Sequence, residues 1–191
     1  MGIGTIIVLG VLAAVVVYAI MIYNNLVQIK HNVTKAWANI DVLLKQRHDE
    51  LPKLVETCKQ YMKFEQETLA KVMEARSRVF AAKEAQNIPQ LGQAEGALRA
   101  TLGSLFALAE AYPDLKTNQT FQQLQTRISG LENAIADRRE FYNESVNVNN
   151  IRIEQFPDTI VAGMFGFKPA QLLEFQSGEK ADVDVGKLFK S

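Results

Sequence analysis

The first 23 residues of this 191-residue chain contain no charged side chain, and this feature constrains the fold more than any other. Residues 3–22 read IGTIIVLGVLAAVVVYAIMI, in which only Thr5 and the hydroxyl of Tyr18 are polar. Twenty helical residues rise about 30 Å, which matches the hydrocarbon thickness of a bilayer. Tyr18 and Tyr23 suit the headgroup level at the end of such a span. Residues 1–23 therefore predict a transmembrane anchor whose residues 3–22 contact the lipid bilayer.

Two other uses of an apolar N-terminus fit this sequence less well. A cleaved signal peptide has a basic n-region, which is absent here, and N-myristoylation requires Ser or Thr where the chain has Ile6. No Lys or Arg precedes the span, whereas Lys30 and Lys35 follow it. The positive-inside rule then predicts a single-pass protein with its N-terminus outside and its body in the cytoplasm.

The remaining residues have the composition of a globular domain. They hold all 21 basic and all 21 acidic residues, so the net charge is zero. Without a basic block, the chain is predicted not to bind nucleic acid. The single cysteine, Cys58, cannot form an intrachain disulfide, which excludes a disulfide-stapled scaffold. The 48% of apolar residues is enough to bury a core.

Apolar residues beyond the anchor recur at alternating steps of three and four, the spacing of helices that pack along a narrow seam. The first such series is Leu26, Ile29, Val33, Trp37, Ile40 and Leu44. No long segment alternates with period two, so the pattern predicts an all-α fold. Pro52, Pro89 and Pro113 fall between the periodic segments, where proline starts or ends helices.

We therefore expect an N-terminal transmembrane helix followed by an antiparallel four-helix bundle of long helices, because short connections favour antiparallel neighbours. The bundle is predicted over residues 24–155, with helices at about 24–48, 51–86, 89–111 and 118–154. Residues 156–191 are predicted to form a tail that is first apolar and then polar. The second and fourth helices exceed the globular average, which indicates that parts of them either protrude or pack on another copy as a coiled coil.

Short sequence words, taken in order, cover essentially the whole chain. They are AWANIDV at 36–42, LPKLV at 51–55, AEAYPDLK at 109–116, REFYN at 139–143 and AGMFGF at 162–167. In this set the chain resembles the LemA family. The resemblance implies a single-pass protein of the bacterial inner membrane whose soluble part is an antiparallel four-helix bundle, and it implies no reaction. A related branch acts in magnetosome membranes, which indicates a role in membrane organisation.

Several charged residues lie on or beside the apolar seams, where burial without a partner costs several kcal/mol. We interpret them as inter-helix ion pairs that fix register; the alternative is a polar ligand or partner site inside the bundle. Trp37 is interpreted as a core anchor rather than as a ligand-stacking ring. The candidates for inter-helix polar contacts or interactions are Trp37, Asp41, Arg47, Glu65, Arg76, Glu110, Glu132, Arg139, Tyr142 and Asn143.

Motifs for catalysis and metal binding are missing from the sequence. The residues three before His31 and His48 are Gln28 and Lys45, so the Glu-x-x-His motif of di-iron bundles is absent. The sequence also has no Cys-x-x-Cys, His-Glu-x-x-His, P-loop or Gly-x-Ser-x-Gly motif. Cys58 lies on an apolar stripe, where a buried thiol is expected. We therefore predict no catalytic residue, no cofactor and no metal, and a protein that is not an enzyme.

Residues 156–175 are strongly apolar, although the predicted bundle has ended before them. Glycines and prolines interrupt the segment, so it is too broken for a second span. Three alternatives stay open: it folds back on its own bundle, packs on another subunit, or lies in the membrane interface. The tail contact candidates are Phe156, Met164, Phe165 and Phe167. Beyond Ser177 the small, polar tail is expected to be loosely ordered.

Together these features predict a membrane-anchored, non-enzymatic structural or scaffold protein. We expect it to form a homo-oligomer and to organise membrane or recruit a protein partner whose identity the sequence leaves open. The alternative is an adaptor or signalling module whose bundle binds a specific cytoplasmic protein.

Overall fold

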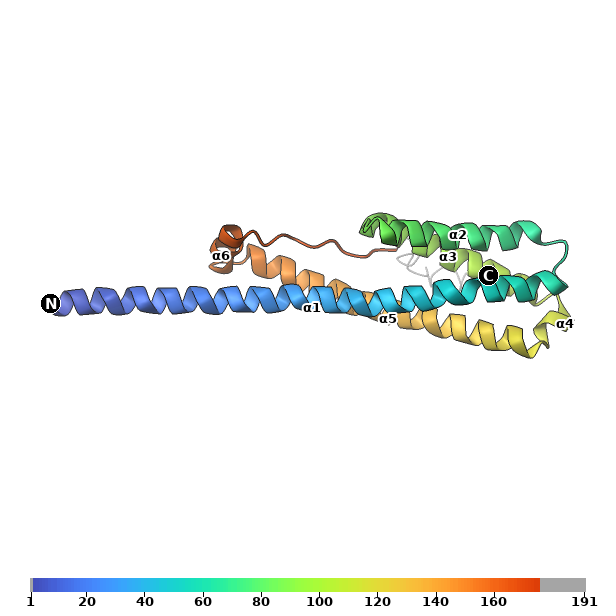
Figure 1. Cartoon of the computed structure of the whole chain (residues 1–191), viewed down its shortest axis with the longest axis horizontal. Coiled ribbons are helices and arrows are strands. Elements are labelled where there is room, and N and C mark those ends of the chain that lie inside the picture. Colours follow the sequence, from blue (N-terminus) through green and yellow to red (C-terminus); the bar gives the residue numbers. More distant parts are fainter. Residues whose placement is uncertain (1, 176–191) are drawn as a thin grey trace, which may run out of the picture. The chain divides into compact units, whose positions relative to one another are not determined.

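The computed structural model describes residues 2–175 of the chain (Figure 1). Helices take up 85% of these described residues, and no strand occurs among them. The prediction of an all-α fold with a long apolar N-terminal helix is therefore confirmed. The polar tail beyond Ser177 lies outside the described residues.

The described helices divide between two compact units. They are α1 Ile3–Tyr61, α2 Gln66–Glu84, α3 Ile88–Ala109, α4 Pro113–Lys116, α5 Gln119–Glu154 and α6 Asp158–Phe165. Among the described residues, unit 1 contains residues 2–42 and 136–172, and unit 2 contains residues 43–135 and 173–175. The helices α1 and α5 each contribute to both units. The predicted division of the chain into anchor, body and tail stays a prediction.

Unit 2 is built from the second part of α1, from α2 and α3, and from the first part of α5. Successive segments run in alternating directions (Figure 1). Its core consists of the apolar seam residues of these segments, which are almost fully buried. They include Leu44, Leu51, Leu54, Cys58, Leu69, Val72, Val79, Leu91, Leu98, Leu102, Leu105, Phe121, Leu124, Ile128, Leu131 and Ile135. The spacing of three and four thus identifies the buried face of each segment.

The predicted break between helices at residues 48–51 is wrong. Pro52 lies inside α1, which continues to Tyr61 before the chain turns into α2. Proline has no N–H, so it cannot donate the helical hydrogen bond to the carbonyl four residues earlier, which is that of His48. In this structure Arg76 of α2 donates from Nε to the His48 carbonyl over 2.9 Å. A side chain from the next helix therefore replaces the hydrogen bond that Pro52 removes.

The starts of α3 and α5 are fixed by asparagine side chains. Asn87 accepts a hydrogen bond from the backbone N–H of Gln90 at 3.1 Å, with Pro89 in the first turn of α3. Asn118 likewise accepts from the backbone N–H of Phe121 at 2.9 Å. Such caps satisfy N–H groups that a helix leaves without an internal partner.

The end of the described chain crosses α3 at a glycine. Leu173 is buried in unit 2, and a Cβ atom built on Gly92 would lie 2.0 Å from the backbone oxygen of Glu174. Any larger residue at position 92 would displace this backbone. Gly92 therefore provides close approach for the tail segment.

Unit 1 combines the first part of α1 with the last part of α5, with α6 and with residues 167–172. One hydrophobic cluster of this unit consists of Ile22, Leu26, Ile153, Val161 and Ala162, with Phe167 packed against it. Before this cluster, α1 exposes its apolar side chains; Ile3 and Met21, for example, are 79% and 63% exposed. Among the described helices, α1 is the one long and apolar enough to cross a membrane.

We predict that Arg76 and Pro52 are energetically coupled. Arg76→Met should lower the free energy of unfolding by about 1.5–3 kcal/mol, because the His48 carbonyl loses a charged donor. In a Pro52→Ala background the new N–H can bond that carbonyl, so Arg76→Met should cost about 1 kcal/mol less. Urea titrations of the four variants in detergent, followed by circular dichroism, measure both costs. Equal costs in the two backgrounds would contradict this account of Pro52.

Candidate functional site

An arginine in the core of unit 2 joins three helices. Arg47 of α1 donates from Nη2 to Oε1 of Glu95 on α3 and from Nη1 to Oε1 of Glu132 on α5. The side chains of Arg47 and Glu95 are 1% and 2% exposed, and that of Glu132 is 16% exposed. The two predicted residues Arg47 and Glu132 therefore meet, but both lie inside the unit and out of reach of a partner protein.

Electrostatics hold this cluster in its charged form. Burial alone would lower the pKa of Arg47, because a low dielectric disfavours charge, but Glu95 and Glu132 outweigh burial and the pKa is raised. Removing one partner of a buried ion pair leaves an uncompensated charge and costs about 3–5 kcal/mol. The cluster consequently fixes how α1, α3 and α5 pack.

Glu95 was missing from the sequence-based candidates, although the sequence carries a signal for it. The seam of α3 continues through Leu91, Glu95, Leu98 and Leu102 in steps of four, three and four. A carboxylate at the second of these positions is a buried charge that needs a basic partner. Periodicity identifies Glu95 as buried, but it does not say which basic residue faces it.

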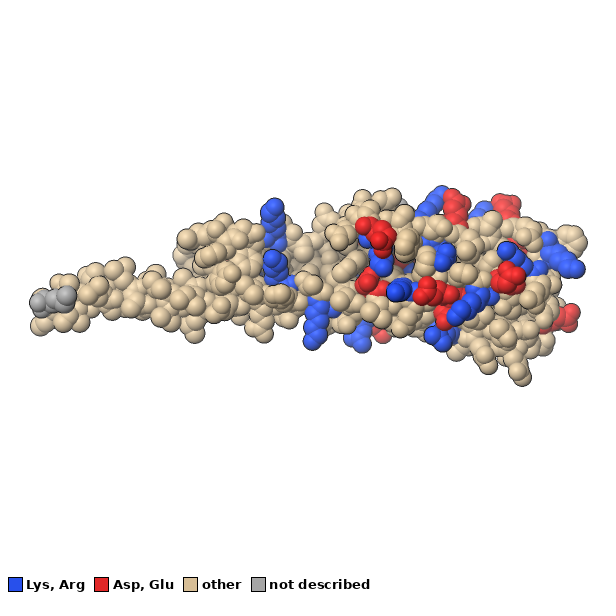
Figure 2. All heavy atoms as spheres, in the orientation of Figure 1, with Lys and Arg blue, Asp and Glu red and all other residues tan. Residues whose placement is uncertain are grey.

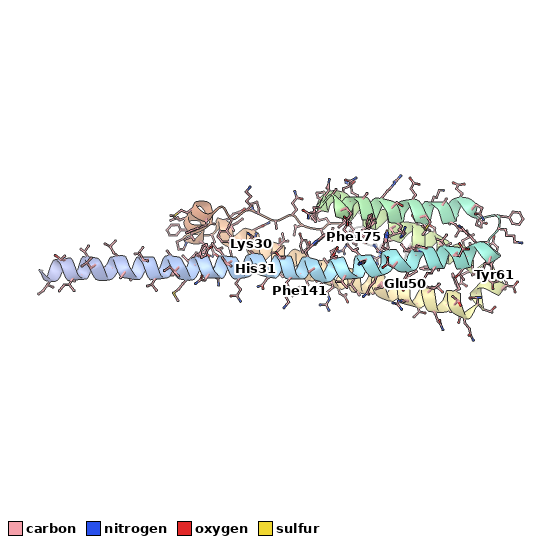
Figure 3. The ribbon with its side chains drawn as sticks, in the orientation of Figure 1. Lys30, His31, Glu50, Tyr61, Phe141 and Phe175 are labelled. Atoms are coloured by element: carbon pink, nitrogen blue, oxygen red, sulfur yellow. The ribbon has the colours of Figure 1, made fainter. Side chains whose placement is uncertain are left out.

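A second acidic residue of α1 is buried near this cluster and was also missed. Glu50 is 8% exposed at its side chain and pairs with Arg127 of α5 at 3.2 Å and with Lys53 at 3.3 Å (Figure 3). Arg127 itself is 63% exposed. This pair links α1 to α5 from the surface, and each carboxylate oxygen of Glu50 has a basic partner.

The histidine whose carbonyl accepts from Arg76 also contributes its ring to the contact between α1 and α2. Arg76 Nη2 lies 2.6 Å from Nε2 of His48, and the His48 ring lies 4.8 Å from that of Phe80. Because arginine can only donate, this geometry requires an unprotonated Nε2. Burial, followed by the charge of Arg76, lowers the pKa of His48.

Two tyrosines mark the end of unit 2 where α1 meets α2. Tyr112 donates its hydroxyl to Glu65 at 3.2 Å, and Asn118 donates to the hydroxyl of Tyr61 at 3.0 Å (Figure 3). Glu65 therefore has a structural partner. Glu110, in contrast, is exposed and pairs with Lys116 at the surface, so it does not join the other candidates.

In unit 1 the predicted aromatic residues lie together. Tyr142 is 5% exposed, and its ring centroid lies 5.6 Å from that of the half-buried Trp37. The Tyr142 hydroxyl donates to the backbone oxygen of Gln171 at 2.9 Å, and burial raises the pKa of Tyr142. Trp37 thus contributes to the packing of α1 on α5.

Two asparagines that sequence reasoning missed hold the tail segment against α5. Asn150 donates to the carbonyl of Ala170 at 3.0 Å and accepts from its N–H at 2.9 Å. Asn149 donates to the carbonyl of Lys168 at 3.4 Å. The Asn-Asn pair thereby supplies the tail backbone with hydrogen bonds that a neighbouring strand would otherwise provide.

The remaining polar candidates of unit 1 lie on α1 and α5. Asp41, Arg139 and Asn143 are half-buried, and each of them has an interaction partner. Arg138 is exposed, so Arg139 is the arginine of this doublet that lies closer to the interior.

Two of the tail contact candidates touch the chain itself. The ring centroid of Phe165 lies 4.7 Å from that of Tyr23. Phe167 is the more buried of the two. It lies against the cluster of α1, α5 and α6, with its ring 5.9 Å from that of Tyr23. Phe156, Met164 and Phe165 are 77%, 76% and 60% exposed. The segment therefore folds back along one face and leaves its other face uncovered.

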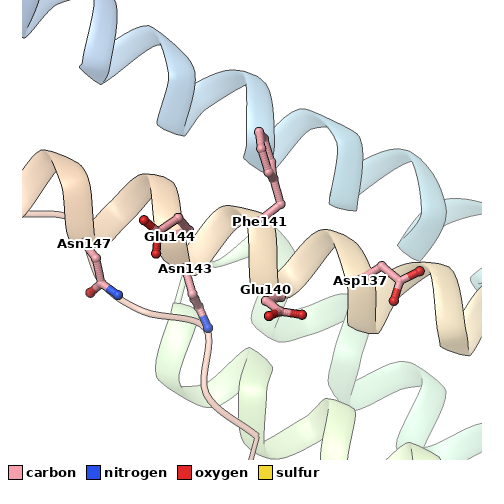
Figure 4. Close-up of a pocket in the computed structure, with 6 residues that line it drawn as sticks. All are labelled: Asp137, Glu140, Phe141, Asn143, Glu144 and Asn147. Atoms are coloured by element: carbon pink, nitrogen blue, oxygen red, sulfur yellow. The ribbon is translucent and has the colours of Figure 1, made fainter.

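A shallow hollow on α5 provides no enclosed site. Its lining residues are Asp137, Glu140, Phe141, Asn143, Glu144 and Asn147, all from this one helix (Figure 4). Nor do the described residues include three His, Cys, Asp or Glu side chains placed to hold a metal ion. Burial raises the pKa of Cys58 to about 11, which makes its thiol a poor nucleophile at neutral pH.

In a comparison with known protein families, residues 36–186 match the LemA family. Protein LemA of Metamycoplasma hominis is 28% identical over 166 residues, which are 86% of this chain and 74% of that protein. Magnetosome protein MamQ 2 of Paramagnetospirillum magneticum is 31% identical over 97 residues, which are 51% of this chain. Magnetosome protein MamQ of Magnetospirillum gryphiswaldense is 27% identical over 97 residues. Each of these matches spans 36% of the length of the magnetosome protein.

We predict that Arg47→Met lowers the free energy of unfolding by about 3–5 kcal/mol, because it leaves Glu95 buried without its partner. Arg78→Met is the matched control, since Arg78 is 66% exposed and pairs with Glu74 on the surface; it should cost less than about 1 kcal/mol. Replacing Arg47, Glu95 and Glu132 together by methionine should recover most of the loss. A similar cost for both single variants, in urea titrations, would contradict the buried cluster.

We also predict that stability falls as the pH drops below 6.5, the ordinary pKa of histidine. Because the pKa of His48 is lowered in the folded protein, the unfolded chain takes up a proton first as the pH falls. The contribution of neutral His48 to the free energy of unfolding is therefore present above pH 6.5 and is lost below it. His48→Gln should reduce this pH dependence, because glutamine keeps an acceptor for Arg76 but does not titrate. Thermal unfolding midpoints between about pH 7.5 and 5.5 measure the difference. Parallel curves for both proteins would contradict the assignment.

Proposed function

Because this chain belongs to the LemA family, we propose that it is a membrane-anchored, non-enzymatic structural protein that self-associates through one face of α5. The observation that carries the proposal is an exposed apolar stripe on this helix, with charged residues beside it. In this proposal the anchor confines copies to one bilayer, and the stripe joins them into an oligomer that organises membrane or recruits a partner.

The N-terminal part of α1 supports the anchor. Nearly all of its side chains from Ile3 to Met21 are apolar and exposed, and the first charged residue of the chain is Lys30. Figure 2 shows charged side chains over much of the visible surface but none on this part of α1. Exposed apolar surface of this extent is unfavourable in water and favourable in lipid. Lipid is therefore its proposed environment.

The interior of unit 2 supports a structural role. Its buried charges are paired: Arg47 with Glu95 and the partly exposed Glu132, and Glu50 with the exposed Arg127. A catalytic group needs unused polar atoms that face a cavity, and these contacts use them within the protein. The LemA family and the magnetosome relatives are not known enzyme families. Surface contacts are thus the proposed mode of action.

The stripe on α5 supports self-association. Phe141, Val148 and Ile151 are 56%, 39% and 61% exposed. They are spaced seven and three residues apart, as are two a positions and the following d position of a coiled coil, and Glu144 holds the d position between Phe141 and Val148. The opposite face of α5 is already used, because Tyr142 and Val146 are buried within unit 1. A second helix on this stripe would bury the exposed side chains.

The direction of insertion is proposed from the charges beside the span. Lys30 and Lys35 follow it and are exposed, and the positive-inside rule places them in the cytoplasm. The N-terminus then lies outside, and the body lies at the cytoplasmic side of the bacterial inner membrane.

A second candidate function is an adaptor that binds a foreign protein at the same place. Asp137, Glu140 and Glu144 line the hollow beside Phe141 (Figure 4). An apolar stripe with acidic residues beside it suits a helix whose flanks are basic. The similarity to the magnetosome proteins covers 97 residues and names no binding partner for the adaptor. Experiment must therefore identify that partner.

Cysteine cross-linking in native membranes separates these possibilities. We expect disulfide-linked dimers from Val148→Cys and Ile151→Cys after mild oxidation, because symmetric a and d positions face each other in a parallel pair. Ser129→Cys is the control, since Ser129 is exposed on α5 but lies off the stripe. The native Cys58 stays silent because it is buried.

The outcomes differ for each account. Dimers at positions 148 and 151, without dimers at 129, support self-association. Adducts of another mass at both stripe positions support the adaptor instead. Monomers at all three positions would contradict a role for the α5 stripe in either form.

A further inference from the structure

The helix α6 has one buried and one exposed face, and both are apolar. Val161 and Ala162 are 7% and 3% exposed, whereas Phe156, Ile160 and Met164 are 77%, 55% and 76% exposed. The exposed three are spaced four residues apart, so they follow one side of the helix and its approach. An exposed apolar face of this kind indicates contact with lipid or with another protein.

The buried face of α6 packs at the end of the apolar stretch of α1. Val161 and Ala162 share a cluster with Ile22 and Leu26. Ile22 is the last residue of the predicted span, and Leu26 lies one helical turn, about 6 Å, beyond it. The side chains of α6 therefore lie at the level where α1 would leave the hydrocarbon.

Aromatic contacts also join the end of α6 to α1 just after the apolar stretch. The ring centroid of Phe165 lies 4.7 Å from that of Tyr23, and Phe167 contacts Tyr23 from the other side of the Gly166 turn. A tyrosine after an apolar span is typical of the membrane–water interface. The exposed ring of Phe165 thus continues the surface of α1 without interruption.

Polar contacts hold α6 in place and keep charge away from its outer face. Asp158 pairs with Arg152 of α5 at 2.7 Å, and Arg152 donates to Asn25 of α1 at 3.2 Å. Gly166 adopts a left-handed conformation with φ of 69° and ends the helix. Between Asp158 and Lys168 the sequence has no charged residue. Lys30 and Lys168 are both exposed.

We propose that α6 is an interfacial helix: its outer face, formed by Phe156, Ile160, Met164 and Phe165, inserts into the boundary between lipid headgroups and acyl chains. The contact gives unit 1 a second attachment to the bilayer beside α1. Lys30 and Lys168 are suited to contact lipid phosphates at the same level. The inference rests on the proposed anchor, because the depth of α6 in the bilayer is inferred from its contacts with Ile22 and Tyr23 of α1.

Lipid is the occupant that the surroundings favour over a second copy. The outer face is continuous with the exposed apolar side chains at the end of α1, such as Ile20 and Met21, and these face lipid in the anchored protein. A short apolar helix at the end of a span, with basic residues beside it, suits the interface between headgroups and acyl chains. The α5 stripe, by contrast, has acidic neighbours and the spacing of a helical seam.

Quenching of single tryptophans by lipids brominated on their acyl chains tests this inference. The full-length chain carries Trp37→Phe, so that each added tryptophan reports alone. Met164→Trp and Ile160→Trp report on α6, and Val17→Trp reports on the anchor. Phe64→Trp is the control in unit 2, since Phe64 is 94% exposed and far along the chain from the span.

We expect bromolipid vesicles to reduce the emission at positions 164 and 160 roughly twofold, with stronger quenching at 17 and none at 64. Unquenched emission at 164 and 160 together with quenching at 17 would overturn the α6 inference and leave the anchor intact; a second copy that covers α6 would give this result. Unquenched emission at 17 would overturn the anchor and the inference together. Equal quenching at 64 and 164 would also overturn the inference, because lipid contact would then not be specific to α6.

Discussion

Burial of a charge-free helix in lipid is the interaction on which the rest of this structure depends. The N-terminal part of α1 exposes apolar side chains along its length, and nothing in the described chain covers them before Ile22. Water is a poor solvent for such a surface, and a bilayer is a good one. In this account the bilayer sets the level of Tyr23 and of α6, and it confines copies of the protein to one plane.

Four charged residues of unit 2 stabilise the packing of its helices. Arg47, Glu95 and Glu132 fix three helices, and Arg76 replaces the hydrogen bond that Pro52 removes from α1. Two apolar surfaces of unit 1 are exposed: the stripe on α5 and the outer face of α6. In the proposed account the stripe on α5 binds a helix and α6 contacts lipid, so the two contacts would use different parts of unit 1.

Sequence periodicity predicted the helical class and the buried faces, because burial of one side of a helix leaves a spacing of three and four. It failed at Pro52, since the donor that compensates the proline comes from Arg76, 24 residues away along the chain. It also missed Glu95, because pairing it with Arg47 requires knowledge of which helices face each other. The tail stayed ambiguous for a similar reason: apolar residues on both faces of α6 do not show which face packs on α1.

The central claim is that this chain is a membrane-anchored oligomer rather than a solitary membrane protein. Imaging of the full-length protein in lipid nanodiscs by cryo-electron microscopy tests this claim most directly, because it gives copy number and lipid contact together. The account predicts several copies per particle, joined along α5, with α1 crossing the bilayer and α6 at its surface. Particles with one copy each, at a protein-to-lipid ratio that permits several, would contradict it.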